Sequence, residues 1–295
     1  MQIHSKQSGF SLFELILVIV LLGIMASGAG LLITPPIDAY SDQVRRQLLV
    51  DQAEMALRQI ARDVRRALPN SIRTTPVGAG WALEMVNTVD GARYRDEFGG
   101  LFITDDDILD FTSPDAAFNF LGSLNLPASS ALSANQRLVI YNTAPANIYN
   151  DAVSGASLGI ITPFGTVMDL TEVTMGGEVE HHLELDTPFQ FSQQSPGQRV
   201  FIVDGPISYI CDPVSGRITR YSDYDYADLQ PTGAPGLEFD GPVVDGPVVT
   251  QVIACSFNYT AGTAQRGGLI TLEISLSDSG ETVTLLHQVH VGNVP

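Results

Sequence analysis

The chain has 295 residues, of which 44% are apolar and 16% charged, and this composition excludes disorder over most of its length. The net charge of −18 is uneven: residues 74–295 contain 7 basic and 27 acidic residues, a net charge of −20, and residues 1–73 contain 8 and 6, a net charge of +2. An acidic surface repels phosphates, which argues against nucleic acid as a partner. Length alone permits one large domain or two of ordinary size.

An apolar run of 24 residues, 10–33, follows the short polar start MQIHSKQSG and contains one charge, Glu14. As a helix it would be about 36 Å long at about 1.5 Å per residue, enough to cross a bilayer core of roughly 30 Å. Lys6, in the preceding segment, gives a positive flank of the kind that stays on the cytoplasmic side. The run predicts a transmembrane helix at residues 10–34.

A cleaved secretory signal peptide is the ordinary alternative for such a run. No small-x-small cleavage site in a polar context follows it, because the small residues at 26–30 lead on to further apolar residues at 31–33. Glu14 also argues against a simple signal, since a carboxylate at the centre of an apolar span costs about 2.5–3.5 kcal/mol on insertion scales, and less near its end. A charge kept there is expected to be functional and to have a partner.

The residues around Glu14, SGFSLFEL at 8–15, resemble the prepilin signature of type IV pilins and type II secretion pseudopilins. In that signature a short basic leader ends in Gly, Phe begins the mature chain, and Glu is the fifth mature residue. The resemblance implies that a membrane-embedded prepilin peptidase cuts after Gly9 and methylates the amine of Phe10. It also implies that Glu14 pairs with the Phe10 amine of a neighbouring subunit, which would remove the cost of two isolated charges. An ordinary signal anchor is the alternative.

A second helical segment follows Pro35 and Pro36, which predict a break or a kink. At 100° per residue, one stripe of residues 35–68 is apolar and is expected to pack on the rest of the chain: Leu49, Val50, Ala53, Leu57, Ile60, Ala61, Val64 and Leu68. The other side is charged: Asp51, Glu54, Arg58, Arg62, Arg65 and Arg66. Val44 and Leu48 lie nearly opposite the stripe, where they either face water as isolated apolar residues or contact a neighbour in a filament.

From residue 69 the pattern changes to a period of two with frequent Gly, Pro, Asn and Asp, which predicts an antiparallel β-rich head at 69–295. The clearest unit is a hairpin that turns at Asp278-Ser279-Gly280. Three strand faces are expected to be buried: Ile270, Leu272, Ile274 and Leu276; Ile253, Cys255, Phe257 and Tyr259; and Ile207, Tyr209 and Cys211. Residues 137–141 and 199–203 are expected to be buried strands, and residues 113–136 and 222–249 long loops.

The two cysteines, Cys211 and Cys255, fit no CxxC or Cys/His zinc spacing. Each lies on the expected buried face of a strand, which is the placement that an inter-strand disulfide requires. The prepilin resemblance implies that the head is exported from the cytoplasm to an oxidising compartment, so we expect one intramolecular disulfide. Two free buried thiols are the alternative.

Segments of the second half resemble a narrower family, the minor pilin O of mannose-sensitive haemagglutinin pili. They are ISYICD, GRITRYSDY, IACSFNY, RGGLITLEISL and the C-terminal LLHQVHVGNVP. With the N-terminal signature, this resemblance covers both ends of the chain and much of its second half. No catalytic residue is implied by it.

Other constellations point to no chemistry. Calcium would find carboxylates in one short segment, Asp105, Asp106, Asp107 and Asp110, but the segment lacks the regular spacing and the Gly of a known calcium loop, which favours a solvated acidic turn. His287 and His290 lie three apart on an expected strand, hence on opposite faces, which argues against a metal site. No GxSxG, HExxH, P-loop or dinucleotide motif is present, so we expect neither an enzyme nor a cofactor.

The sequence as a whole predicts an α+β, pilin-like protein with a leader peptide at 1–9, a transmembrane helix at 10–34, an amphipathic helix at 35–68 and an extracytoplasmic head at 69–295. The resemblance implies a minor pilin that initiates or caps a type IV pilus, held in the inner membrane by a single span with its head in the periplasm, and later displayed on the cell surface. Its expected partners are other pilins, prepilin peptidase, an assembly platform and the lipid bilayer. The alternatives are a J-like pseudopilin of a type II secretion system and a signal-anchored ligand-binding module.

Overall fold

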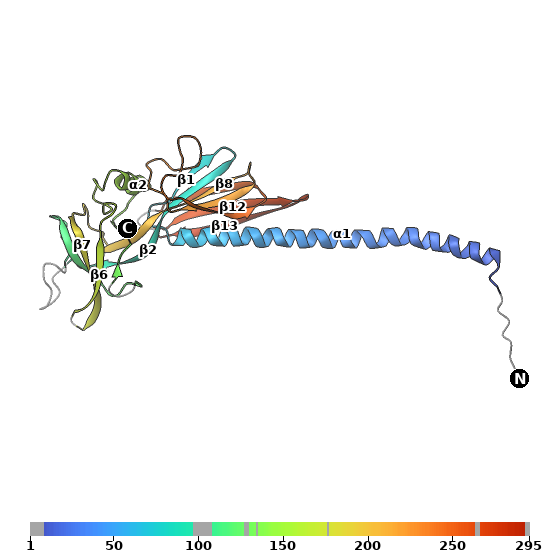
Figure 1. Ribbon diagram of the computed structural model, residues 1–295, viewed down its shortest axis with the longest axis horizontal. Helices are drawn as coiled ribbons and strands as arrows, with labels where there is room; N and C mark the ends of the chain where they lie inside the picture. Colours follow the sequence, from blue (N-terminus) through green and yellow to red (C-terminus); the bar gives the residue numbers. More distant parts are fainter. Residues whose placement is uncertain are drawn as a thin grey trace.

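The computed structural model describes residues 9–96, 108–126, 130–133, 135–175, 177–262 and 266–292, without the side chains of residues 29–38, 130 and 175. An N-terminal helix is followed by a large antiparallel β region, so the expected α+β class is confirmed (Figure 1). The helix lies along one side of the β region and projects beyond it (Figure 1). Most of the leader peptide expected at 1–9 is outside the described residues.

Helix α1, Leu12–Arg65, has 54 residues and is continuous through positions 35 and 36, so the expected break does not occur. A proline inside a helix removes one N–H and bends the axis, but it does not have to end the helix. The helix ends at Arg66, whose N–H donates to the carbonyls of Asp63 and Val64. Arg62 and Arg65 lie in the last turn, where their charge suits the negative end of the helix dipole.

The amphipathic pattern expected for residues 35–68 is confirmed. The apolar stripe is buried, with Leu49, Ala53, Leu57, Ile60, Ala61, Val64 and Leu68 each less than 5% exposed and Val50 partly buried. The six charged residues of the other side are exposed, as are Val44 and Leu48. Burial of one stripe, and not helix propensity alone, therefore holds this half of α1 against the head.

The larger sheet has ten strands in the order β10-β9-β8-β2-β3-β7-β6-β4, with β1 paired to β2, β5 paired to β8, and every pair antiparallel. The strands are β1 Arg73–Val77, β2 Gly80–Tyr94, β3 Asp115–Leu121, β4 Ser130–Ala131, β5 Arg137–Ile140, β6 Met168–Met175, β7 Glu178–Phe189, β8 Arg199–Asp212, β9 Arg217–Ser222 and β10 Val244–Thr250. A short helix, α2 Pro145–Val153, follows β5. The strands expected at 137–141 and 199–203 are thus present.

A second, three-stranded sheet contains β11 Val252–Thr260, β12 Gly268–Asp278 and β13 Glu281–Val291 in that order. The hairpin β12–β13 turns where the sequence predicts, between the paired residues Asp278 and Glu281. Ser279 and Gly280 both have positive φ, 48° and 94°, as a tight hairpin turn requires. Gly280 adopts this conformation without steric cost because glycine has no β-carbon.

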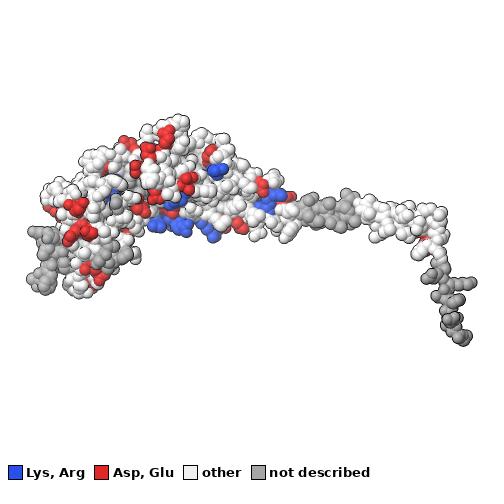
Figure 2. Space-filling view, viewed as in Figure 1, with Lys and Arg blue, Asp and Glu red and all other residues white. Residues whose placement is uncertain are grey.

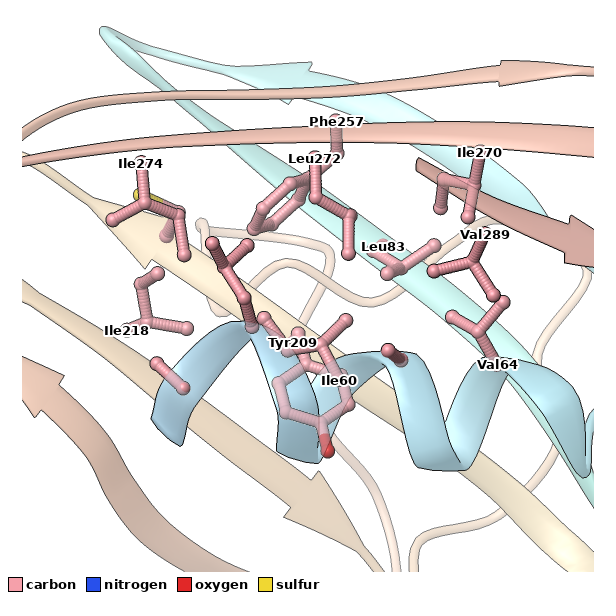
Figure 3. Close-up of a cluster of buried hydrophobic side chains, with 14 of the residues drawn as sticks. Ile60, Val64, Leu83, Tyr209, Ile218, Phe257, Ile270, Leu272, Ile274 and Val289 are labelled. Carbon is pink, nitrogen blue, oxygen red and sulfur yellow. The ribbon is translucent and has the colours of Figure 1, made fainter. Parts of the chain in front are cut away.

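The main core lies between α1 and both sheets (Figure 3). Ile60 and Val64 of the helix meet Leu83 and Tyr209 of the larger sheet and the inward face of the smaller one. That inward face is the one expected for the hairpin, Ile270, Leu272, Ile274 and Leu276, all fully buried. The C-terminal half of α1 is therefore part of the fold of the head, and its removal would uncover two sheets at once.

Three expectations about the head are wrong. Residues 113–136 are not one long loop, because β3 and β4 lie within them; Phe118, Asn119 and Phe120 are all fully buried, so the segment has no alternation to read. Ile253 is 51% exposed instead of buried, because a β-bulge between Val252 and Ala254 shifts the register and turns Val252 inward. The loop expected at 222–249 ends early, in β10.

Candidate functional site

The expected cleavage site lies immediately before α1. Gly9 and Phe10 are exposed and outside the helix, and the backbone turns helical after Ser11, which has φ −70° and ψ 143°. The N–H groups of Glu14 and Leu15 donate to the Ser11 carbonyl at 3.0 and 3.1 Å. The peptide bond between Gly9 and Phe10 is thus free of helical hydrogen bonds, and a β-carbon added at Gly9 would meet nothing within 4 Å.

Glu14 is the acidic residue of the first helical turn, where a carboxylate suits the positive end of the helix dipole. Its neighbours on every side are apolar and at least 43% exposed: Phe10, Leu12, Phe13, Leu15, Ile16, Leu17, Val18, Ile19, Val20, Leu21, Leu22, Ile24 and Met25. Within the described ranges, Glu14 takes part in no ion pair. A helix that is apolar all round is typical of one covered by lipid or by other helices, and a carboxylate within it is expected to have a partner.

Among the residues whose side chains the structure describes, no helical stretch is both long and apolar enough to cross a membrane.

At the other end of α1, a polar cluster ties the helix to the larger sheet. Asp63 Oδ2 accepts hydrogen bonds from Tyr209 Oη at 2.7 Å and from Arg220 Nε at 2.9 Å. Burial, together with the bond to the carboxylate, raises the pKa of the Tyr209 phenol. The sequence gives no sign of this cluster, because Asp63 finds its partners more than 140 residues away.

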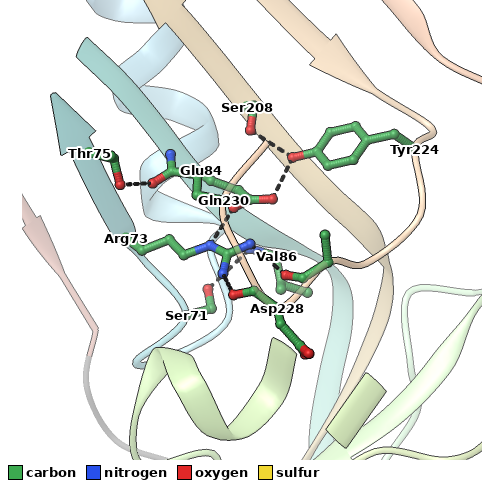
Figure 4. Close-up of polar contacts among 10 residues, drawn as sticks. Ser71, Arg73, Thr75, Glu84, Val86, Ser208, Tyr224, Asp228 and Gln230 are labelled. Atoms are coloured by element: carbon green, nitrogen blue, oxygen red, sulfur yellow. Dashed lines mark hydrogen bonds and ion pairs between the residues drawn. The ribbon is translucent and has the colours of Figure 1, made fainter. Parts of the chain in front are cut away.

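A second polar cluster lies under the 223–230 segment (Figure 4). The Glu84 carboxylate is fully buried, and its two oxygens accept from Arg73 Nε at 2.5 Å and from Tyr224 Oη at 2.9 Å. Burial raises the pKa of Glu84, and the Arg73 guanidinium acts in the opposite direction. Arg73 also donates to the carbonyls of Asp228 and Ala227 at 2.6 and 2.8 Å. Because both carboxylate oxygens accept bonds from within the protein, the cluster holds the 223–230 segment on β2.

The disulfide expected from the sequence is present between Cys211 of β8 and Cys255 of β11, with their Cα atoms 6.6 Å apart. Strand β8 belongs to the larger sheet and β11 to the smaller one. The bond therefore crosses from one sheet to the other beside the core that α1 fills.

The acidic segment considered for calcium lies mostly outside the described residues, which include only Asp110. Its carboxylate accepts from Thr112 N at 2.6 Å, Thr112 Oγ1 at 2.7 Å and Ser113 Oγ at 2.6 Å. These bonds lower the pKa of Asp110 to about 2, and the residue is half-buried. In the part of the chain that the structure covers, no group of three or more His, Cys, Asp or Glu residues is arranged to hold a metal ion.

The histidines do not gather. On β13, His287 and His290 pair with Leu272 and Leu269 and lie on opposite faces, as the strand spacing predicts. His181 and His182 lie in the other sheet, on β7, where His181 Nδ1 accepts from the N–H of Leu124 at 3.0 Å.

The N-terminal residues match a known family, described as the prokaryotic N-terminal methylation motif, over residues 4–30. This match indicates a type IV pilin-like protein, a class that includes pilus subunits and pseudopilins. In general terms, it implies interaction with other pilins and with a prepilin peptidase. No curated protein and no solved structure matches the chain, and the narrower resemblance to minor pilin O has no support from these comparisons.

Proposed function

We propose that the protein is a minor pilin that takes part in assembly of a type IV pilus, where it initiates or caps the filament. The methylation motif at residues 4–30 carries this proposal. Its cleavage point falls at Gly9-Phe10, the one place where the structure offers an exposed, non-helical backbone next to the apolar helix. Glu14, in the first turn, supplies the negative charge that a neighbouring N-terminal amine requires.

In this proposal residues 10–34 cross the inner membrane once, the head folds in the periplasm, and the subunit then moves into the pilus. The apolar sequence of residues 10–33 and the exposure of its large apolar side chains, in the part whose side chains are described, support a lipid or helical environment. The disulfide supports an oxidising compartment for the head. We expect no catalytic activity and no resident cofactor, since the polar clusters of the head are closed structural ties.

The large head favours a minor over a major subunit, because a head repeated along the shaft must pack at every step. The second-half segments that resemble minor pilin O point to mannose-sensitive haemagglutinin pili as the system in which the subunit acts. The nearest alternative is a J-like pseudopilin of a type II secretion system, which shares the N-terminal processing. A signal-anchored ligand-binding module is the other alternative, and it has no use for Glu14.

N-terminal peptide mass of the chain purified from membranes tests the proposal. The mature protein is expected to begin with N-methylphenylalanine at Phe10. Gly9→Val, which places a branched side chain at the scissile bond, is expected to leave the leader attached, whereas Ser8→Ala is the matched control and is expected to be cleaved normally. Cleavage within residues 26–30, or no cleavage of the wild-type chain, would show that this is not a pilin-like subunit.

A further inference from the structure

A cleft of about 600 Å³ lies where the end of α1 meets the head, and four arginines line it. Arg65 and Arg66 come from the end of the helix, Arg93 from β2 and Arg199 from β8. All four are exposed. We call these residues the arginine cleft. Figure 2 shows Lys and Arg side chains gathered beside the head end of α1, whereas Asp and Glu are scattered over the rest of that face of the head.

The positive charge of the arginine cleft is not balanced from within. Arg93 and Arg199 are direct partners in the antiparallel pairing of β2 and β8, and like charges opposite each other destabilise a sheet. Neither one, nor Arg65 or Arg66, belongs to any ion pair among the described residues. Asp90 is the sole carboxylate that lines the described cleft, and its two oxygens accept the N–H groups of Gly91 and Asn125 at 2.8 and 2.7 Å.

The face of α1 that leads to the cleft is likewise not covered by the head. At 100° per residue, Arg58, Arg62 and Arg65 fall on the same side as four exposed apolar residues: Tyr40, Val44, Leu48 and Met55, which are 70%, 40%, 56% and 62% exposed. This side is opposite the stripe that packs on the head. A single surface thus runs along α1 from an apolar part into the arginine cleft.

If the proposed function is correct, the position of the cleft along α1 favours the head of a neighbouring subunit over lipid headgroups as its partner. If Glu14 of one subunit meets the Phe10 amine of the next, neighbouring helices are offset by about four residues, or about 6 Å. The heads then lie side by side at nearly one height. Helix α1 is about 81 Å long at about 1.5 Å per residue, so a cleft at its far end lies well beyond a bilayer core of roughly 30 Å and its lipid headgroups.

We propose that the arginine cleft docks the carboxylate-rich head of a neighbouring filament subunit. In this chain itself, residues 74–295 carry a net charge of −20. Guanidinium groups bind carboxylates with two parallel hydrogen bonds. A carboxylate seated between Arg93 and Arg199 would remove the repulsion between them. The apolar part of the same helix face adds contact area that carries no charge requirement.

The variant Arg199→Glu separates docking from folding, because it gives Arg93 an opposite charge across the two strands while it destroys the anion site. In cells that make the full-length chain and its filament, we expect the amount of this variant in sheared pili to fall at least fivefold relative to its amount in membranes. Its melting temperature is expected to equal or exceed that of the wild type. Arg217→Glu is the matched control, since Arg217 is an exposed strand arginine outside the cleft, and it is expected to be incorporated normally.

Arg93→Gln removes charge from the other strand and is the second variant, with a smaller loss of incorporation expected. Wild-type incorporation of either folded variant overturns the proposal. If the folded variants are incorporated normally but no longer bind a soluble polyanion such as heparin, the cleft serves an acidic polymer and the docking proposal is wrong. Failure of the proposed function is distinguishable, because the wild-type chain itself would then lack cleavage after Gly9 and be missing from sheared pili.

Discussion

Glu14 is a lone carboxylate on a helix that is apolar and exposed on all sides. Such a side chain has no role in folding the head, because it lies at the opposite end of α1 from the core. Its place in the first turn is compatible with an isolated helix, yet its charge is costly in an apolar environment without a partner. We therefore expect Glu14 to act in assembly, and its substitution should leave the monomer unchanged.

Glu14→Ala is expected to insert in the membrane and to be cleaved after Gly9 like the wild type. We expect its amount in sheared pili to fall by tenfold or more, because the amine of a neighbouring Phe10 would be left unpaired. Quantitative immunoblotting of sheared pili against membranes measures this. Glu54→Ala is the control, since Glu54 is an exposed helix carboxylate that pairs with Arg58 at i,i+4. Equal incorporation of Glu14→Ala and wild type would contradict the pairing role.

Asp110 gives a pH prediction for the head. Its pKa in the folded protein is about 2, lowered from 3.8 first by the bond from Ser113 and then by those from Thr112. A depressed carboxyl pKa contributes stability that is present above the unfolded value and is lost as the pH falls through about 2. Ser113→Ala is expected to raise the pKa of Asp110 towards 3.8, as read from its carboxyl carbon by NMR titration. An unchanged pKa would show that these hydrogen bonds do not form in solution.

At the scale of elements, sequence patterns predict the helices and strands that have one solvent-exposed side and one buried side. The α1 stripe from Leu49 to Val64 and the β12–β13 hairpin alternate in that way, and both are where the pattern places them. Strand β3 is buried around Phe118 and Phe120 on both sides and leaves no periodic signal. The bulge at Ile253 and the facing of Arg93 with Arg199 depend on strand register, which no local pattern specifies.

The candidate site divides in the same way. The expected cleavage point and Glu14 belong to one short continuous motif, so a single sequence contains the signal that predicts them. The Tyr224–Glu84 bond, the Asp63 cluster and the arginine cleft join residues from distant elements. Only folding brings these residues together, and a single sequence contains no signal for their proximity.

The disulfide is the element-level tie between the two sheets, and its removal is expected to weaken the head. It joins residues 44 apart in sequence, for which the chain-entropy model gives about 4 kcal/mol, a large part of a typical stability of about 5–15 kcal/mol. Cys211→Ser should lower the melting temperature of the purified protein markedly and make the head sensitive to protease, without affecting cleavage after Gly9. Two thiols that react with an alkylating agent in the denatured, unreduced wild type would disprove the bond.

At the scale of the whole molecule, the boundary between helix and head drawn from the sequence at residue 69 is not a boundary of the core. Residues 49–64 of α1 pack against both sheets in one core. We therefore expect the head and this half of the helix to unfold together as one cooperative unit. This arrangement leaves the first half of α1 free to take part in other associations while the second half stays committed to the head.

A soluble fragment that begins at residue 39 is therefore expected to be monomeric and to melt cooperatively. A fragment that begins at residue 69 is expected to aggregate or to lack a cooperative transition, because Leu272, Ile274 and Phe257 would lose their cover. Size-exclusion chromatography and thermal melting of the two fragments measure the difference. Equal behaviour of the two would mean that α1 is a dispensable attachment.

The packing of α1 also has a mechanical consequence. Strands β12 and β13 run alongside the helix (Figure 1), and the helix packs against both of the sheets that the Cys211–Cys255 bond holds together. A pull transmitted along α1 from an anchored N-terminus would load many side-chain contacts at once in shear, instead of opening them one after another. The disulfide would keep the two sheets from separating under that load. The contacts between α1 and the head should therefore resist a force applied along the helix axis.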